Sequence, residues 1–291
     1  MEQISSDFPL IETNELAELI KKGTPDLTIV DANFKGEEFD NTFKKERIPG
    51  ARYIHIRDIG DKSNELPNML PTPEKFHALL QDLDIGVNDH VVCYGDDMIV
   101  GATRAYWMFK TYGFPNVHVL NGTFQKWKKE GHPVETGEES WKQNRRKRTE
   151  EDFKFQLNSC NIAYMRDVKR IVGDKCEGYE LIDARPAKDF EGEQGTKSGH
   201  MPGAKNIPSS DVLQEFEAFK SKDEILETLK KHGVDLSKKV RTTCRTGMAA
   251  SVLYVASKIV GTKDLALYDG SWTEWSKYED NPVEYGATGS K

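Results

Sequence analysis

The segment YELIDAR at residues 179–185 repeats, with small changes, the earlier segment LTIVDAN at residues 27–33. Both are short apolar runs followed by polar residues, a pattern typical of a buried β-strand. Two further pairs of segments keep the same order and nearly the same spacing: RIPGARYI (47–54) with HMPGAKNI (200–207), and LNGTFQKW (120–127) with YDGSWTEW (268–275). These repeats predict that one domain occurs twice in the chain.

In each half, short apolar strands alternate with helical patterns, which predicts βα units around a mostly parallel sheet flanked by helices. The expected strands are residues 27–30, 52–54, 91–94 and 117–120, then 181–182, 205–207, 240–243 and 265–268. The expected helices are residues 14–23, with Asn14 as its N-cap, 72–83, 163–173 and 221–233. We therefore predict an α/β protein with two tandem domains, residues 1–137 and 161–291, and a linker at 138–160, in which the basic run 145–148 is solvated.

The composition excludes several classes of protein. A net charge of −7 over 291 residues disfavours bulk attraction to nucleic acid, and no apolar run is long enough to span a membrane. The four cysteines show no metal-ligand or disulfide spacing, so we predict free thiols and no metal. Because the first ten residues, MEQISSDFPL, lack a leader pattern, we expect a cytoplasmic protein; a mitochondrial location stays open.

One cysteine stands out from the others by its position. Cys244 lies in VRTTCRTGMAAS (240–251), between an expected strand and an expected helix, where open α/β sheets bind their ligands. Gly247 lets the backbone curl so that the amides of residues 245–250 form an anion nest. These amides and the charge of Arg245 are expected to lower the pKa of the thiol. Cys244 is therefore the predicted nucleophile, and Cys93, Cys160 and Cys176 are predicted to be structural.

Taken together, the duplication and the motifs DAR, GHMPGAKNIP, CRTGMA and YDGSWTEW resemble the rhodanese superfamily, in particular its two-domain thiosulfate and 3-mercaptopyruvate sulfurtransferases. This resemblance implies two rhodanese-like domains, of which the first is not catalytic. It also implies transfer of a sulfane sulfur through a persulfide on Cys244, with no cofactor. The implied partners are a small-molecule donor, a thiol or cyanide acceptor and thioredoxin-like reductants, with neither nucleic acid nor a membrane. The substrate-binding residues expected beside Cys244 are Arg245, Thr246, Gly247, Met248, Ala249, Arg185 and Lys188.

Departures from the family pattern leave the donor open. Arg245 favours thiosulfate, because a dianion gains more from a charged neighbour, whereas Thr246 favours 3-mercaptopyruvate. Asp189 stands where the family usually has an arginine, and Arg47 where it often has a histidine. The substitutes considered for the missing arginine are Lys188, Lys197 and Arg47. Arg185 is a candidate either for facing the substrate or for bracing the end of its strand.

Two functions from other classes compete with sulfur transfer. A cysteine-based phosphatase would need an arginine six residues after the nucleophile, but Ala250 stands there. A binding or regulatory protein that keeps the fold without turnover is compatible with the departures at residues 47 and 189. The intact loop after Cys244 favours the enzyme.

Overall fold

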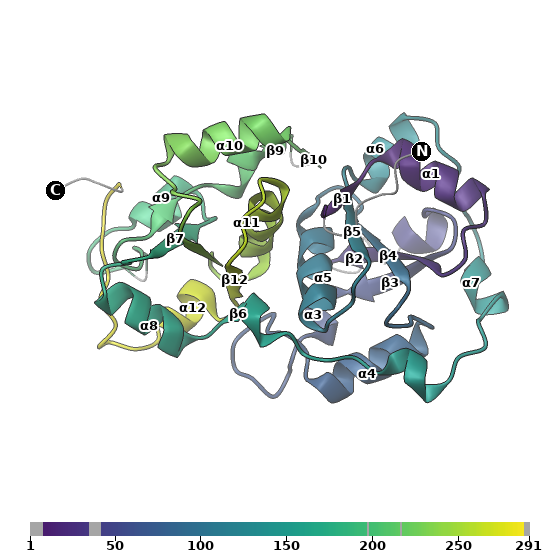
Figure 1. The fold of residues 1–291 in the computed structure, drawn as a ribbon, viewed down its shortest axis with the longest axis horizontal. Coiled ribbons are helices and arrows are strands. Elements are labelled where there is room, and N and C mark those ends of the chain that lie inside the picture. Colours follow the sequence, from purple (N-terminus) through teal and green to yellow (C-terminus); the bar gives the residue numbers. More distant parts are fainter. Residues whose placement is uncertain (1–7, 35–41, 197, 216, 288–291) are drawn as a thin grey trace. The chain divides into compact units, whose positions relative to one another are not determined.

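The computed structural model describes residues 8–34, 42–196, 198–215 and 217–287, which form two compact units (Figure 1). Unit 1 comprises the residues up to Lys62, then Leu70–Asn158 and Glu215–Phe219. Unit 2 comprises Ser63–Met69, Ser159–Gln214 and the residues from Lys220 onward. Within the described ranges each unit has a five-stranded parallel sheet with helices beside it, so the predicted α/β class is confirmed.

The two sheets have the same strand order, as a duplicated domain requires. The order is β1-β5-β4-β2-β3 in unit 1 and β6-β12-β11-β7-β8 in unit 2. The strands of unit 1 are β1 (Leu10–Ile11), β2 (Leu27–Asn33), β3 (Ala51–His55), β4 (His90–Tyr94) and β5 (Val117–Leu120). Those of unit 2 are β6 (Ile162–Ala163), β7 (Tyr179–Asp183), β8 (Lys205–Asn206), β11 (Lys239–Thr243) and β12 (Leu265–Tyr268). Two short strands, β9 (Leu213–Gln214) and β10 (Ala218–Phe219), lie between β8 and β11 in the sequence.

Thr72 and Ser221 cap the starts of two longer helices, since the side chain of Thr72 accepts from the N–H of Lys75 and that of Ser221 from the N–H of Glu224. The helices of unit 1 are α1 (Thr13–Lys21), α3 (Ile56–Ile59), α4 (Pro73–Asp82), α5 (Val100–Thr111), α6 (Phe124–Lys129) and α7 (Ser140–Gln143). Those of unit 2 are α8 (Met165–Gly173), α9 (Ala187–Glu191), α10 (Lys222–Lys231), α11 (Met248–Ile259) and α12 (Ser271–Trp275). Short 3-10 helices cover Glu150–Phe153, Ser159–Asn161 and Ser209–Val212. The N-cap predicted at Asn14 is wrong, because the N-cap lies two residues earlier at Glu12, which forms a capping box with Glu15.

Each unit buries its own apolar core between sheet and helices. In unit 1, Leu16 of α1 and Trp127 of α6 pack with Ile29 and Val92 on one face of the sheet. Unit 2 repeats this arrangement with α8 and α12. Its core residues on that face include Val168, Leu181, Ala266, Trp272 and Trp275. Since all strands are parallel, the loops at their carboxyl ends meet at one edge of each sheet.

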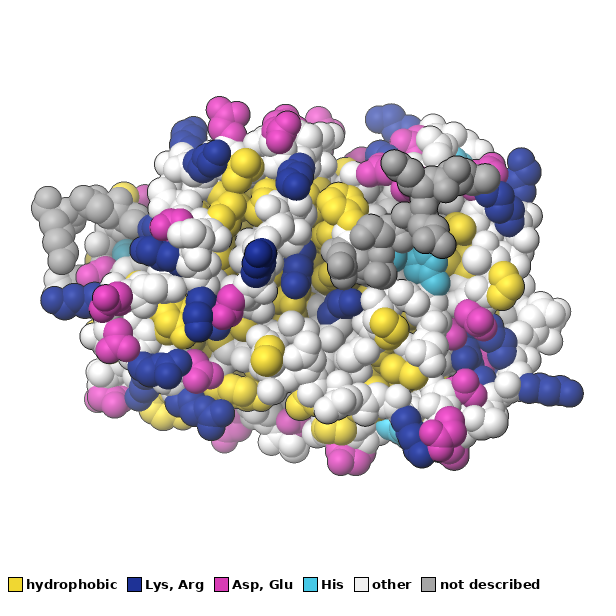
Figure 2. Space-filling model, viewed as in Figure 1, with side chains coloured by type: hydrophobic (Ala, Val, Ile, Leu, Met, Phe, Trp, Pro, Cys, Tyr) yellow, Lys and Arg dark blue, Asp and Glu magenta, His cyan; other side chains and the backbone are white. Residues whose placement is uncertain are grey.

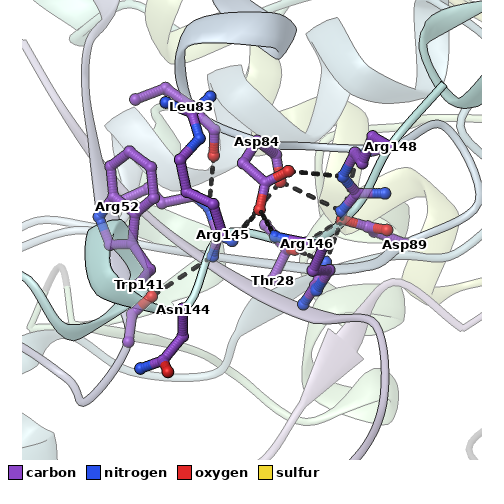
Figure 3. Close-up of polar contacts among 12 residues, drawn as sticks. Thr28, Arg52, Leu83, Asp84, Asp89, Trp141, Asn144, Arg145, Arg146 and Arg148 are labelled. Carbon is purple, nitrogen blue, oxygen red and sulfur yellow. Dashed lines mark hydrogen bonds and ion pairs between the residues drawn. The ribbon is translucent and has the colours of Figure 1, made fainter. Parts of the chain in front are cut away.

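The stretch predicted to be a solvated linker packs on unit 1 instead. Arg146 Nη1 and Arg148 Nη2 each lie 2.7 Å from Asp89 Oδ2, and Arg148 Nε lies 2.8 Å from Asp84 Oδ1 (Figure 3). Only 9% of the Arg148 side chain is exposed. The expectation of a solvated basic run is therefore wrong for Arg146 and Arg148, because two buried aspartates of unit 1 attract them.

Charged side chains of both signs are scattered over the visible surface, with uncharged polar and hydrophobic areas between them (Figure 2). Figure 2 shows Lys and Arg side chains interspersed with Asp and Glu over the face in view. None of the helices in the described ranges combines the length and the apolar character that crossing a bilayer requires.

Candidate active site

Cys244 directly follows β11, at the carboxyl edge of the sheet of unit 2. Its backbone N–H donates to Ser271 Oγ at 3.2 Å, and its carbonyl accepts a hydrogen bond from the N–H of Trp272 at 3.0 Å. Ser271 Oγ donates in turn to the carbonyl of Tyr268 at 2.8 Å. The residue is buried, with 2% of its surface exposed. The loop after β12 thus fixes the backbone from which the thiol projects.

The loop after Cys244 curls around the sulfur. Gly247 has a φ of 79° and is the N-cap of α11, in the left-handed region that glycine adopts without strain. Backbone N–H groups of Ala250, Thr246 and Gly247 stabilise the charged form of the sulfur and so act to lower the pKa of the thiol. These three donors make the loop a cradle for negative charge on Sγ.

Burial nevertheless raises the pKa of the Cys244 thiol above its ordinary value. Loss of solvation is the largest cause, and the carboxylate of Asp183 raises the pKa further, against the lowering effect of the amides. The predicted lowering of the pKa is therefore wrong for the resting protein. The local sequence shows the amides and Arg245 but does not show how completely the sulfur is buried.

Thr246 has a partner that the sequence did not indicate. The side-chain amide of Asn68 donates to Thr246 Oγ1 at 3.1 Å, and Asn68 belongs to the segment Ser63–Met69 that clusters with unit 2. No motif singles out this asparagine, because the contact joins residues far apart in the chain. After Gly247, the helix α11 begins with Met248, which is buried, and Ala249, which is partly buried.

Arg185 is held in a dense set of hydrogen bonds. Its Nη2 lies 2.7 Å from Asp183 Oδ2, its Nε lies 3.0 Å from both oxygens of that carboxylate, and Nη2 also donates to the carbonyl of Gly199 at 2.8 Å. Nη1 donates to the carbonyl of Asp189 at 3.1 Å, and the guanidinium lies 4.8 Å from the Trp272 ring. Only 2% of this residue is exposed. Its contacts brace the ends of β7 and α9 against α12.

The other cationic candidates lie in different surroundings. Lys188 is exposed on α9, whereas Arg47 is 1% exposed in unit 1, where its Nη2 lies 2.8 Å from Glu135. Lys197 lies outside the described residues. Arg245 is about half exposed, and its Nη2 lies 3.1 Å from Asp189 Oδ2.

The corresponding corner of unit 1 holds a glycine. The N–H of Phe124 donates to the carbonyl of Gly95 at 2.8 Å, as that of Trp272 does to Cys244. An ungapped alignment of the two halves would place Asp96 opposite Cys244, but the loop between β4 and α5 is one residue longer than the loop between β11 and α11, so Gly95 takes the corresponding position. A Cβ added at Gly95 would lie 2.2 Å from the carbonyl oxygen of Met98, so this corner has no room for a cysteine.

The described ranges contain no group of three or more His, Cys, Asp or Glu side chains placed to hold a metal ion. No disulfide joins Cys93, Cys160, Cys176 and Cys244, all of which lie in the described ranges, and Cys160 is the exposed one among them.

Comparisons with known proteins relate the whole chain to one family. The profile of the rhodanese-like domain matches residues 12–130 and 165–278. The thiosulfate sulfurtransferase of Gallus gallus is 37% identical over 289 residues, covering 96% of each chain. The 3-mercaptopyruvate sulfurtransferase of Escherichia coli K12 is 30% identical over 270 residues, covering 89% of this chain and 92% of the relative. The crystal structure of SseA from Escherichia coli, a 3-mercaptopyruvate sulfotransferase, has a TM-score of 0.78 and 28% identity to this chain, covering 90% of this chain and 98% of that one.

Proposed function

Since this chain belongs to the rhodanese family and is a two-domain sulfurtransferase, we propose that it moves a sulfane sulfur from thiosulfate to cyanide or a thiol through Cys244. The observation that carries this proposal is the position of Cys244 directly after β11, where Gly247 turns the loop into α11 and the amides of Ala250, Thr246 and Gly247 stabilise negative charge on the sulfur. Such a cradle favours a negatively charged sulfur, which both the thiolate and its persulfide supply.

The reaction divides into two displacements at sulfur. The Cys244 thiolate attacks the outer sulfur of thiosulfate; a new S–S bond forms on the protein as the donor S–S bond breaks, and sulfite leaves with its electron pair. The acceptor then attacks the outer sulfur of the persulfide, and Cys244 leaves as a thiolate. Covalent catalysis of this kind gives ping-pong kinetics.

The residues around Cys244 take distinct roles in this proposal. Amides of the loop, including those of Thr246 and Gly247, hold charge on the reacting sulfur, while Met248 and Ala249 keep the start of α11 compact. Arg245 and exposed Lys188 attract the anionic donor. Arg185 is a positioning residue, because its hydrogen bonds join β7, α9 and α12.

Two anionic donors, thiosulfate and 3-mercaptopyruvate, each have support from the residues after Cys244 and from a relative. Arg245 and the thiosulfate sulfurtransferase of Gallus gallus support thiosulfate. Thr246 and the Escherichia coli relative support 3-mercaptopyruvate as the alternative. Comparing kcat/KM for the two donors decides between them, and a preference above about tenfold for 3-mercaptopyruvate would reverse our order.

The acceptor and the location complete the proposal. Thioredoxin-like reductants are suitable thiol acceptors, because a dithiol releases the persulfide sulfur as sulfide and closes to a disulfide. Four free cysteines fit a reducing compartment, and we place the protein in the cytoplasm.

The central experiment is sulfur loading of Cys244→Ser. The pure protein is treated with thiosulfate, and cyanide-releasable sulfur is measured together with the mass of the peptide that contains residue 244. We expect loading and turnover to be lost in Cys244→Ser and kept in the control Cys160→Ser, with both variants folded by circular dichroism. Turnover that survives in Cys244→Ser would overturn the assignment, and a wild-type protein that never loads would favour a non-catalytic binding module.

A further inference from the structure

The side chain beside the proposed nucleophile is paired with a carboxylate. Arg245 Nη2 lies 3.1 Å from Asp189 Oδ2, with 54% and 41% of the two side chains exposed. Arg245 is the first residue of the loop after Cys244, and Asp189 lies on α9. A positive and a negative charge therefore stand together next to the amide cradle.

Both partners have a fixed backbone. The carbonyl of Arg245 accepts hydrogen bonds from the N–H of Thr273 at 2.9 Å and from Thr273 Oγ1 at 2.7 Å. The carbonyl of Asp189 accepts one from Arg185 Nη1 at 3.1 Å, and Arg185 is itself paired with Asp183 at the end of β7. Hydrogen bonds from neighbouring residues thus hold the backbone positions from which the side chains of Asp189 and Arg245 meet.

We propose that Asp189 is a specificity-determining residue, whose carboxylate offsets the charge of Arg245 and narrows the preference for dianionic over monoanionic sulfur donors. This inference rests on the proposed function, in which an anionic donor approaches Cys244 beside Arg245. Exposed ion pairs are weak, so a donor anion can reach the guanidinium, but it does so against the field of Asp189. Thiosulfate carries two negative charges and 3-mercaptopyruvate carries one, so the field opposes thiosulfate more strongly.

Coulomb's law gives the size of the effect. At a separation on the order of 7 Å and a dielectric constant of about 80, one unit of charge changes binding about three-fold and two units about seven-fold. The ratio of kcat/KM for thiosulfate to that for 3-mercaptopyruvate is therefore expected to rise about three-fold when the carboxylate is removed. Because this is a ratio, partial misfolding of a variant cancels from it.

The test compares Asp189→Asn with Asp264→Asn, a matched neutralisation of another aspartate paired with an arginine. Asp264 lies 2.8 Å from Arg241 at the start of β12, at the opposite edge of the sheet. Both variants are assayed with both donors at low ionic strength and in about 1 M NaCl, where the screening length falls to about 3 Å.

We expect the donor ratio to rise about three-fold in Asp189→Asn at low salt, to return to the wild-type value in 1 M NaCl, and to stay unchanged in Asp264→Asn. An unchanged or lower ratio in Asp189→Asn, or a rise that salt leaves intact, would overturn the role of Asp189. If the wild-type protein turns over neither donor, the proposed function fails instead, and this outcome is separate because the ratio is then undefined.

Discussion

Asp89 joins the segment after α7 to the body of unit 1, and its removal is expected to destabilise that unit. Its Oδ2 atom accepts hydrogen bonds from Thr28 Oγ1, Arg146 Nη1 and Arg148 Nη2, each at 2.7 Å, and from the N–H of Gly86 at 3.1 Å (Figure 3). Only 3% of its side chain is exposed. Asp89→Ala would leave these donors without their shared acceptor.

The contacts that remain set the magnitude of the loss. Removing one partner of a buried ion pair costs about 3–5 kcal/mol. After Asp89→Ala, Arg148 still contacts Asp84, and Arg146 Nη2 still donates to the carbonyl of Leu27. We therefore expect the lower end, a loss of about 3 kcal/mol in the free energy of unfolding, which lowers Tm by about 6–12 °C for a unit of this size. Asp89→Asn keeps an acceptor oxygen, so its loss in the free energy of unfolding should be about half that of Asp89→Ala.

The assay has to separate the two units of the intact protein. Urea unfolding gives the overall change, and hydrogen exchange followed by peptide mass spectrometry assigns it to unit 1 or unit 2. Glu18→Ala is the control, because Glu18 is more than half exposed and lies 3.7 Å from Lys21. A loss below about 1 kcal/mol, or equal deprotection of both units, would refute the reasoning.

Two further predictions follow from buried titratable groups. Because burial raises the pKa of the Cys244 thiol, the rate of its alkylation by iodoacetamide should still increase with pH above pH 9. The rate is measured on the peptide that contains residue 244, and a pH–rate curve with its midpoint below pH 8 would contradict the prediction. The pKa of Asp31 is raised to about 8, mainly by burial and further by the charge of Asp96, although a hydrogen bond from Tyr94 acts to lower it. The folded protein therefore holds a proton on Asp31 that the unfolded chain releases. The free energy of unfolding of wild-type unit 1 should therefore fall between about pH 4 and pH 8. In urea unfolding, the stability of Asp31→Asn relative to the wild type should rise across the same pH range. A stability difference between the two proteins that does not change with pH would show that Asp31 is ionised in the folded state.

The sequence predicted the duplicated sheets well, because strands such as β4 and β12 are apolar runs long enough to show a pattern. It missed β1 and β6, which are two residues long and depend on pairing with a distant strand rather than on local pattern. The segment 145–148 was predicted to be solvated because neither Asp84 nor Asp89 is near it in the chain.

In the site, too, features with a local sequence pattern could be predicted, and features that depend on distant residues could not. Cys244 could be singled out because a strand, a cysteine, a glycine and a helix follow one another within a few residues. The pairing of Arg245 with Asp189 and that of Thr246 with Asn68 could not, since each joins separate segments of the chain. The direction of the shift in the pKa of Cys244 was missed for a related reason, because burial depends on the whole unit.

The strand order has a consequence for synthesis of the protein on the ribosome. In each sheet the first strand pairs with the last, β1 with β5 and β6 with β12, so neither sheet is complete until nearly all of its own residues have been translated. Unit 1 reaches that point long before Cys244 is made, and domains generally fold in the order of synthesis. Cys244 is thus synthesised after the whole sheet of unit 1, within a domain whose own sheet then needs only β12 for its completion.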